Sequence, residues 1–357
     1  MMQLTISEKQ PSICLNMIVK NESHIIKNTL QMLCLKIKFT YWVICDTGST
    51  DNTPEIIETF FKENNINGEL LNHEWRDFAY NRTKALNAAY NKTDLLFIFD
   101  ADDEICGNVI MPTIVSSSGY LLNFGSSSGI SYQRPLLINN RIKWQYKSVI
   151  HEYIECLEPN PTFQTLNGDY YIISGRTGSR NKDPNKYFND AQILEKAYYE
   201  AKQNQDSLYL RYAFYAANSY ADANLPNDAI KWYQTTLEND NWNQEKYMSC
   251  YKLFHQYTKI GEKERGFFYL VESQKYDNER QECMYHLIQH YCANNMNHVA
   301  YQYYCLIKDY YETTYLANYL NNNKIMDGKL FIEHDKGGFR SEEHTSELQS
   351  PCNLVCR

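Results

Sequence analysis

The chain has 357 residues, of which 43% are hydrophobic and 22% are charged. This is the composition of an ordinary folded protein rather than a disordered or fibrous one, and the length favours two domains. The formal net charge of −8 provides no basic field for a phosphate backbone. We therefore expect no nucleic-acid partner.

Residues 1–11 form an N-terminal extension that lacks the basic and apolar regions of a signal peptide. No apolar run approaches the roughly 20 residues that a transmembrane helix needs. The 11 cysteines are scattered without paired CxxC spacings, which favours a reducing compartment. These features predict a cytoplasmic protein with no transmembrane segment.

A first domain is expected over residues 12–180. From Ser12 to about Asp100 it alternates short apolar runs with amphipathic stretches. The expected strands are Ile13–Val19, Tyr41–Cys45, a strand around Leu70 and Leu71, Leu95–Phe99 and Tyr170–Ile173. Three helices are expected. The first follows Asn21-Glu22-Ser23, the second begins near Pro54, and the third spans Asp77–Tyr90. This alternation predicts an α/β domain with a Rossmann-like, mostly parallel sheet, flanking helices, and ligand sites at the carboxyl ends of the strands.

Residues 185–325 have helical periodicity almost throughout and contain an internal repeat. Tyr220, Tyr257 and Tyr291 lie 37 and 34 residues apart, and small or apolar residues follow each of them at the ninth and thirteenth positions. The spacing is close to that of tetratricopeptide helix pairs. We therefore expect a second, all-α domain built from tetratricopeptide-like repeats.

Residues 326–357 form a polar tail. Within it, residues 340–357 resemble the translation of a common sequencing-library adapter, and we interpret them as an artefact. The alternative is an ordinary disordered tail. Neither interpretation assigns a function to this segment.

Asp100 and Asp102 follow directly after a predicted buried strand. Carboxylates at that position are suited to holding Mg²⁺ or Mn²⁺ against a diphosphate. If the chain is extended there, residues two apart face the same side, so both carboxylates reach one ion and Asp103 points elsewhere. Acidic loops are usually only solvated, so the DxD pattern gains its weight from the buried strand before it.

Five motifs appear in an order that resembles the family 2 glycosyltransferases of the GT-A fold, over about residues 12–169. They are Met17-Ile18-Val19-Lys20-Asn21-Glu22, Asp46-Thr47-Gly48-Ser49-Thr50-Asp51-Asn52-Thr53, Asn81-Arg82, Phe99-Asp100-Ala101-Asp102-Asp103-Glu104 and Val149-Ile150-His151-Glu152. The helical C-terminus resembles a subgroup with a fused tetratricopeptide-like domain, some members of which glycosylate peptides. The resemblance implies inverting transfer from a nucleotide-diphosphate sugar, with a UDP-sugar favoured, to a peptide, protein or glycan, aided by Mn²⁺ or Mg²⁺.

The resemblance also implies donor-binding roles for several residues. Asp46 would accept a hydrogen bond from the nucleotide base, and Asn21 and Glu22 would face the nucleoside. Ser49 and Asp100 would complete this part of the site. The alternatives are that Asp46 only caps its turn and that the Asn21-Glu22 pair only begins a helix.

The remaining candidates concern the diphosphate, the metal and the proton. Arg82 would approach the diphosphate, or would simply lie exposed on its helix. His151 would join Asp100 and Asp102 as a metal ligand, and its alternative is a hydrogen-bonded strand residue. Glu152 would be the general base, with Asp103 and Glu104 as the competing candidates.

Two other functions are consistent with parts of this pattern. The first is a scaffold in which a catalytically degenerate α/β domain is joined to an interaction module. The second is nucleotidyl transfer onto a sugar phosphate, but residues 17–23 lack the expected Gly-rich loop. A homodimer through the helical domain is a further expected partner.

Overall fold

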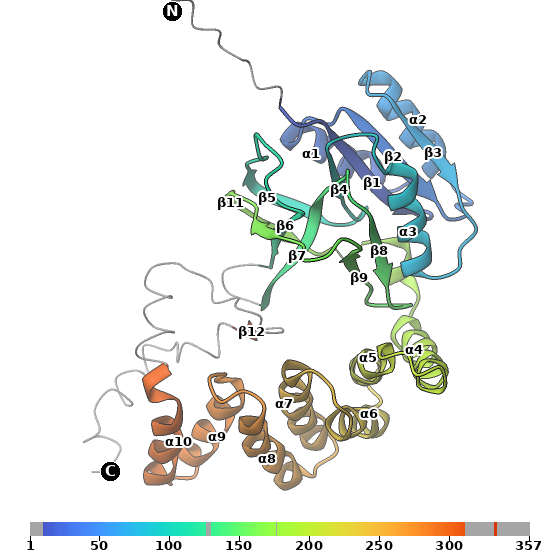
Figure 1. Ribbon diagram of the computed structural model, residues 1–357. Helices are drawn as coiled ribbons and strands as arrows, with labels where there is room; N and C mark the ends of the chain where they lie inside the picture. The colour runs from blue at the N-terminus through green and yellow to red at the C-terminus, as the bar shows by residue number, and fades with distance from the viewer. Residues whose placement is uncertain (1–9, 126–129, 176, 311–331, 334–357) are drawn as a thin grey trace, which may run out of the picture. The chain divides into compact units, whose positions relative to one another are not determined.

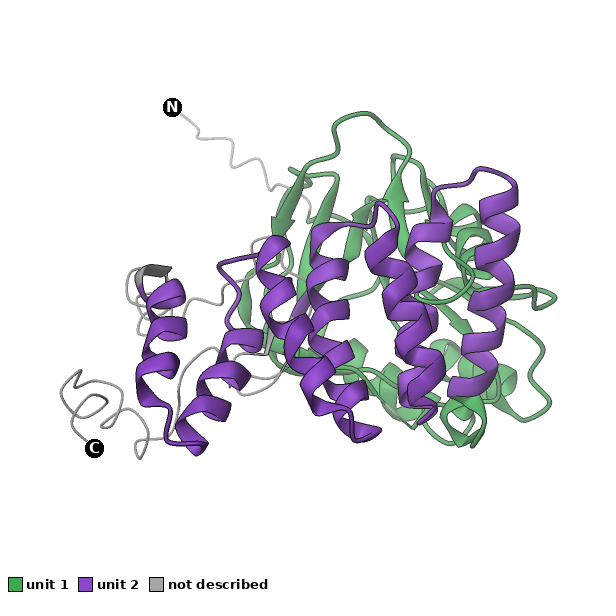
Figure 2. Ribbon diagram, turned by 90° about the horizontal axis from the view of Figure 1, so that it is seen from below, with its two compact units in different colours: residues 1–125, 133–186 green, residues 126–132, 187–357 purple. Residues whose placement is uncertain are grey.

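A computed structural model of the chain describes residues 10–125, 130–175, 177–310 and 332–333 (Figure 1). The chain divides into two compact units (Figure 2). The first contains residues 1–125 and 133–186, and the second contains residues 126–132 and 187–357.

The first part of unit 1 has the predicted alternation of strands and helices. Its elements are β1 (Ile13–Val19), α1 (Ile26–Lys36), β2 (Tyr41–Asp46), α2 (Thr53–Glu63), β3 (Gly68–Asn72), α3 (Phe78–Ala89) and β4 (Leu95–Ile98). Pro54 lies in the first turn of α2, where its missing N–H costs nothing. The Asp77 side chain caps α3 by accepting a hydrogen bond from the Tyr80 N–H at 2.7 Å.

The order of the strands explains where a ligand site forms. The strands run β3-β2-β1-β4, and all these neighbours are parallel. Because crossovers between parallel strands are right-handed, α1 and α2 cover one face and α3 covers the other. The chain reverses its direction across the sheet between β1 and β4, so the loops after these strands diverge and leave space for a ligand.

The rest of unit 1 makes the sheet mixed rather than mostly parallel. Its strands are β5 (Glu104–Val109), β6 (Gly119–Phe124), β7 (Ile130–Asn139, of which residues 130–132 belong to unit 2), β8 (Trp144–Lys147), β9 (Tyr153–Cys156), β10 (Phe163–Thr165) and β11 (Gly168–Ile173). β7 runs antiparallel to β4, and β11 runs antiparallel to β5. β8 and β9 form a separate antiparallel pair. Sequence periodicity missed most of these short strands, because several are half exposed and lack a continuous apolar run.

The core of the sheet lies in β1 and β4. Cys14, Leu15, Leu95 and Phe97 are fully buried, as expected for strands covered by helices on both faces. Burying one such leucine side chain contributes about 1.5–3 kcal/mol. This rigid centre supports the loops that follow β1 and β4.

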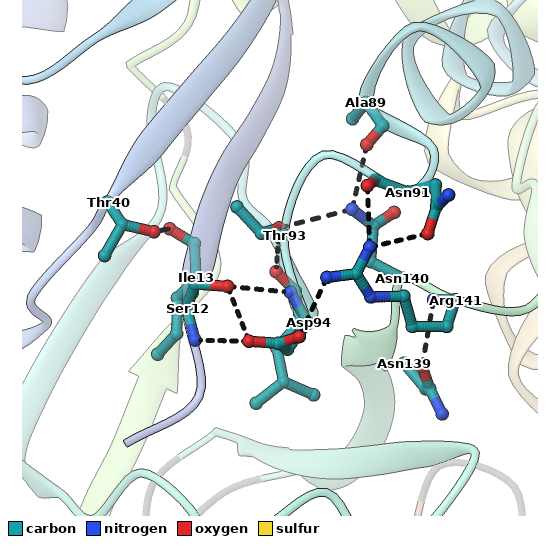
Figure 3. Close-up of polar contacts among 11 residues, drawn as sticks. Ser12, Ile13, Thr40, Ala89, Asn91, Thr93, Asp94, Asn139, Asn140 and Arg141 are labelled. Carbon is teal, nitrogen blue, oxygen red and sulfur yellow. Dashed lines mark hydrogen bonds and ion pairs between the residues drawn. The ribbon is translucent and has the colours of Figure 1, made fainter. Parts of the chain in front are cut away.

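A network of polar side chains connects β1, β4 and β7 at the end of the sheet opposite the loops that follow β1 and β4 (Figure 3). The Asp94 carboxylate accepts hydrogen bonds from the Ser12 N–H at 2.9 Å and the Ser12 hydroxyl at 2.6 Å. Arg141, just after β7, donates to Asp94 at 2.9 Å and to the Asn91 carbonyl at 2.7 Å. The starts of β1 and β4 are thereby tied to the end of β7.

The described residues from 187 onward in unit 2 are helical apart from a short strand. Its helices begin with α4 (Lys186–Gln203), α5 (Leu208–Asp222), α6 (Pro226–Glu238) and α7 (Asn243–Lys259). They continue with α8 (Lys263–Glu272), α9 (Glu282–Ala293) and α10 (Asn297–Tyr310). Short 3-10 turns cover Ser179–Lys182 in unit 1 and Ser273–Lys275 in unit 2. The two-residue strand β12 (Ile332–Glu333) pairs antiparallel with residues 130 and 131 of the same unit.

The repeat seen in the sequence falls at matching places in three successive helix pairs. Tyr220, Tyr257 and Tyr291 lie in α5, α7 and α9, and the residues nine positions later lie in α6, α8 and α10. Ala229 and Gly266, at two of these later positions, are buried. A Cβ on Gly266 in α8 would lie 3.1 Å from the Phe254 backbone in α7, so the two helices of this pair are in close contact at that position. Residues 311–325 of the predicted helical domain, and residues 326–331 and 334–357 of the tail, lie outside the described residues.

None of the helices in the described ranges is both long and apolar enough to cross a membrane.

Candidate functional site

The loops after β1 and β2 are joined by hydrogen bonds at the carboxyl edge of the sheet. Asn21 adopts a left-handed conformation with φ of 56°, which asparagine tolerates well. Its N–H donates to Ser49 Oγ at 2.8 Å, and its side-chain oxygen accepts from the Thr50 N–H at 2.7 Å. Asn21 thus holds the β2 loop, and does not merely begin α1.

Asp46 is 4% exposed at the end of β2. Its carboxylate accepts hydrogen bonds from the Ser49 N–H at 2.9 Å and the Ser49 hydroxyl at 2.5 Å. The Gly48 N–H donates to the same carboxylate at 3.3 Å, and Gly48 itself has a φ of 97° that favours glycine. The geometry therefore gives Asp46 and Ser49 a turn-capping role whether or not a nucleotide is bound.

The DxD segment forms a turn rather than an extended strand end. The Asp103 N–H donates to the Asp100 carbonyl at 3.3 Å, which closes the turn. Asp100 and Asp102 therefore do not face one ion as residues two apart in an extended chain would, and this prediction is wrong because β4 ends at Ile98. The turn sends Asp100 and Asp102 to different partners.

Arg82 lies between two carboxylates. Its Nη2 contacts Asp100 Oδ1 at 2.6 Å, and its Nε contacts Glu152 Oε1 at 2.6 Å. The Arg82 and Glu152 side chains are only 7% and 10% exposed, while Asp100 is 26% exposed. Arg82 is therefore a buried bridge between α3, β4 and the loop after β8, and not an exposed helix residue.

Asp103 is 4% exposed, and its Oδ1 accepts a hydrogen bond from the Gly175 N–H at 3.1 Å. Its Oδ2 is buried and has no hydrogen-bond partner among the described residues. Burial raises the pKa of Asp103 to about 7, and the nearby Asp100 charge adds to the increase. A carboxyl group with such a pKa can exchange a proton near neutral pH.

One loop satisfies three carboxylates of the site through its backbone. Besides the Gly175 contact with Asp103, the Gly178 N–H donates to Asp102 Oδ2 at 3.1 Å, and the Ser179 N–H donates to Glu22 at 3.1 Å. A Cβ on Gly175 would lie 1.7 Å from the Asp102 carbonyl oxygen, so this close approach requires glycine. Burial raises the pKa of Glu22 despite the Ser179 hydrogen bond.

His151 and Glu152 lie in the connection between β8 and β9, so the alternation rule for strands does not separate them. His151 is exposed and has a φ of 55°. Among the described residues, no three His, Cys, Asp or Glu side chains are grouped so that they could hold a metal. The predicted ligands Asp100, Asp102 and His151 therefore do not form such a group.

A divalent ion still fits Asp102. Mg²⁺ commonly takes only one or two protein carboxylates and completes its shell with phosphate oxygens and water. Asp102 Oδ2 accepts the Gly178 hydrogen bond, but no described residue donates a hydrogen bond to Oδ1. Asp100 is less suited, because two arginines already neutralise it.

Arg134 on β7 is a residue of this site that the sequence did not reveal. Its Nη1 lies 3.7 Å from Asp100 Oδ2. The antiparallel register pairs Phe97 of β4 with Leu137 of β7, and extending it three residues sets Asp100 opposite Arg134. The only sequence signal was a single arginine ahead of an apolar run, which does not disclose a pairing between distant strands.

Comparison with known proteins identifies the class. Residues 14–113 match the model of the family described as Glycosyl transferase family 2. This segment extends from β1 to just beyond β5 and includes Asn21, Asp46, Arg82 and Asp102. No curated protein matches the chain.

Several solved structures are similar to the chain at low identity. They include S. aureus TarS residues 1–349 in complex with UDP-GlcNAc, at 13% identity, covering 74% of this chain and 91% of that chain, with a TM-score of 0.37. The mannosyltransferase PcManGT from Pyrobaculum calidifontis in complex with GDP-Man and Mn²⁺ has 11% identity, covers 74% of this chain and 87% of that chain, and has a TM-score of 0.36. Glucosyl-3-phosphoglycerate synthase from Mycobacterium tuberculosis, in complex with Mn²⁺, UDP and glucosyl-3-phosphoglycerate, has 16% identity, covers 26% and 34%, and has a TM-score of 0.21.

The family match defines residues 14–113 as a glycosyl transferase family 2 domain, and the protein is a transferase enzyme. The mixed α/β sheet with flanking helices confirms the α/β class predicted from the sequence.

Proposed function

We propose that the protein is a metal-dependent, inverting glycosyltransferase that uses a nucleotide-diphosphate sugar, with UDP-sugars favoured. The observation that carries the proposal is the convergence of polar loops at the carboxyl edge of β1, β2 and β4. Asn21 holds the β2 loop, and the Gly178-Ser179 amides connect Glu22 to Asp102. In an open α/β sheet, this edge at a reversal of strand order is where nucleotides bind.

Asp46, Ser49, Asn21 and Glu22 form the nucleoside end of the proposed site. The buried Asp46 carboxylate is already oriented by Ser49, so little side-chain freedom is lost when a base donates to it. Asp102 is proposed as the principal ligand of Mn²⁺ or Mg²⁺, an ion that supplies positive charge to the leaving diphosphate. His151 stays a predicted additional ligand.

In the proposed reaction, an acceptor hydroxyl attacks the anomeric carbon from the face opposite the diphosphate. A new bond forms between the acceptor oxygen and that carbon, the bond to the diphosphate oxygen breaks, and the acceptor proton passes to a carboxylate. Glu152 is held by Arg82 at 2.6 Å and is the first candidate for this base. Asp103, with a pKa of about 7, is the second.

We further propose that the helical unit binds the acceptor, which is a peptide, protein or glycan. Stacked helix pairs form extended surfaces suited to such ligands. The three matching helix pairs support a tetratricopeptide-like class for this unit.

The function is tested by thermal melting with UDP- and GDP-sugars, with and without Mn²⁺. A bound donor stabilises the native state, so the midpoint should rise in the wild type and in Glu58→Gln, an exposed carboxylate control on α2. Asp102→Asn should lose the Mn²⁺-dependent part of the shift and also lose sugar transfer. A folded wild type that shifts with no donor would instead favour the scaffold function.

A further inference from the structure

The two arginines of the site differ in how much of their charge is already neutralised. Arg82 is 7% exposed and makes 2.6 Å contacts with both Asp100 and Glu152. Arg134 is 27% exposed, and its only ion pair among the described residues is a 3.7 Å contact with Asp100. Arg134 is therefore more accessible than Arg82, and its positive charge is less completely neutralised by neighbouring carboxylates. Both properties favour the binding of an anion.

A buried hydroxyl lies close to the same charges. Tyr146 on β8 is 7% exposed, yet its hydroxyl has no hydrogen-bond partner among the described residues. Arg82 lies over the Tyr146 ring at 5.6 Å, and the hydroxyl interacts electrostatically with both Arg82 and Arg134. Burying an unsatisfied hydroxyl costs about 1–3 kcal/mol, so a ligand that accepts its hydrogen bond would recover this cost.

Resting on the proposed function, we propose that Arg134 and the Tyr146 hydroxyl form the subsite that receives the donor diphosphate, while Arg82 positions Glu152. Arg134 supplies the cation and Tyr146 supplies a hydrogen bond to a phosphate oxygen. Burial raises the pKa of Tyr146 to about 12, so its hydroxyl remains a donor throughout the neutral range. Arg82 keeps the Glu152 carboxylate in place through its 2.6 Å contact.

The chain contains a matched control for Arg134. Arg134–Asp100 and Arg141–Asp94 are two Arg–Asp ion pairs at opposite ends of the same antiparallel β4–β7 pair. Arg141 is on the side of the network in Figure 3, away from the carboxyl edge of the sheet. Arg134→Met and Arg141→Met remove the same charge from the same strand pair.

The test is isothermal titration of each variant with UDP and GDP in the presence of Mn²⁺, compared with the nucleosides uridine and guanosine. Loss of a hydrogen bond to a charged group corresponds to about a 10- to 100-fold weaker affinity. Arg134→Met should lose that factor for the diphosphate that the wild type binds, with nucleoside affinity unchanged. Arg141→Met should match the wild type for every ligand.

Tyr146→Phe covers the case in which Arg134→Met does not fold. Removing an unsatisfied buried hydroxyl should leave the melting temperature unchanged or higher, while diphosphate affinity falls several-fold. A diphosphate affinity equal to wild type in Tyr146→Phe and in folded Arg134→Met would overturn this subsite and leave the proposed function standing. A wild type that binds neither UDP nor GDP would overturn both.

Discussion

Replacing Arg82 with methionine tests whether the buried ion pairs hold the site together. Methionine fills much of the volume of the arginine side chain, so the cavity contribution should be small. Removing one partner of a buried pair typically costs about 3–5 kcal/mol, because the other charge is left without compensation. Asp100 is 26% exposed and keeps Arg134, whereas Glu152 is 10% exposed and loses its 2.6 Å partner. We therefore expect a loss near the lower limit, about 3 kcal/mol.

The assay is native-state hydrogen exchange of the amides in α3 and β4, which reports on this unit separately from the helical unit. A loss of about 3 kcal/mol corresponds to exchange about 100-fold faster for amides that open with the whole unit. The double variant Arg82→Met/Glu152→Gln removes the uncompensated charge, so it should be more stable than Arg82→Met alone. Arg141→Met, which breaks a pair with side chains 47% and 40% exposed, should cost about 1 kcal/mol or less.

Two results would refute this reasoning. One is a cost below about 1 kcal/mol for Arg82→Met, the magnitude of an exposed pair. The other is a double variant less stable than the single one, since that would mean that Glu152 contributes to stability independently of the arginine.

Two further predictions concern the loops and the network around the site. The Ser12 hydroxyl, followed by Arg141, lowers the pKa of Asp94 to about 2, so its stabilisation is present above pH 4 and is lost as the pH falls toward 2. Asp94→Asn should be less stable than wild type at pH 6, with a gap in urea midpoint that narrows as the pH falls from about 4 toward 2; a constant gap would contradict the carboxylate's role. Gly175→Ala should displace its loop, because the new Cβ would lie 1.7 Å from the Asp102 carbonyl. Tryptic cleavage after Arg180 should then be several-fold faster, and an unchanged rate would show that the loop tolerates the side chain.

The sequence by itself determined the framework of the α/β unit. Apolar runs of four to seven residues, as in Ile13–Val19 and Leu95–Ile98, predict buried strands because both of their faces must be covered. Local signals such as Pro54 and Asp77 placed the helix starts, since capping depends only on neighbouring residues. The alternation then placed Asn21, Asp46 and Asp100 at one edge of the sheet.

Only the tertiary structure decided what those residues contact. The ion pairs of Arg82 with Asp100 and Glu152 join residues 18 and 70 positions apart, and no local pattern encodes such distances. Arg134 reaches the site because β7 pairs antiparallel with β4, and the sequence alone does not predict the register of that pair. The prediction that Asp100 and Asp102 face one ion was wrong for the same physical reason. The chain turns after β4 and contacts the Gly175 loop, so the two-residue periodicity of an extended chain does not apply there.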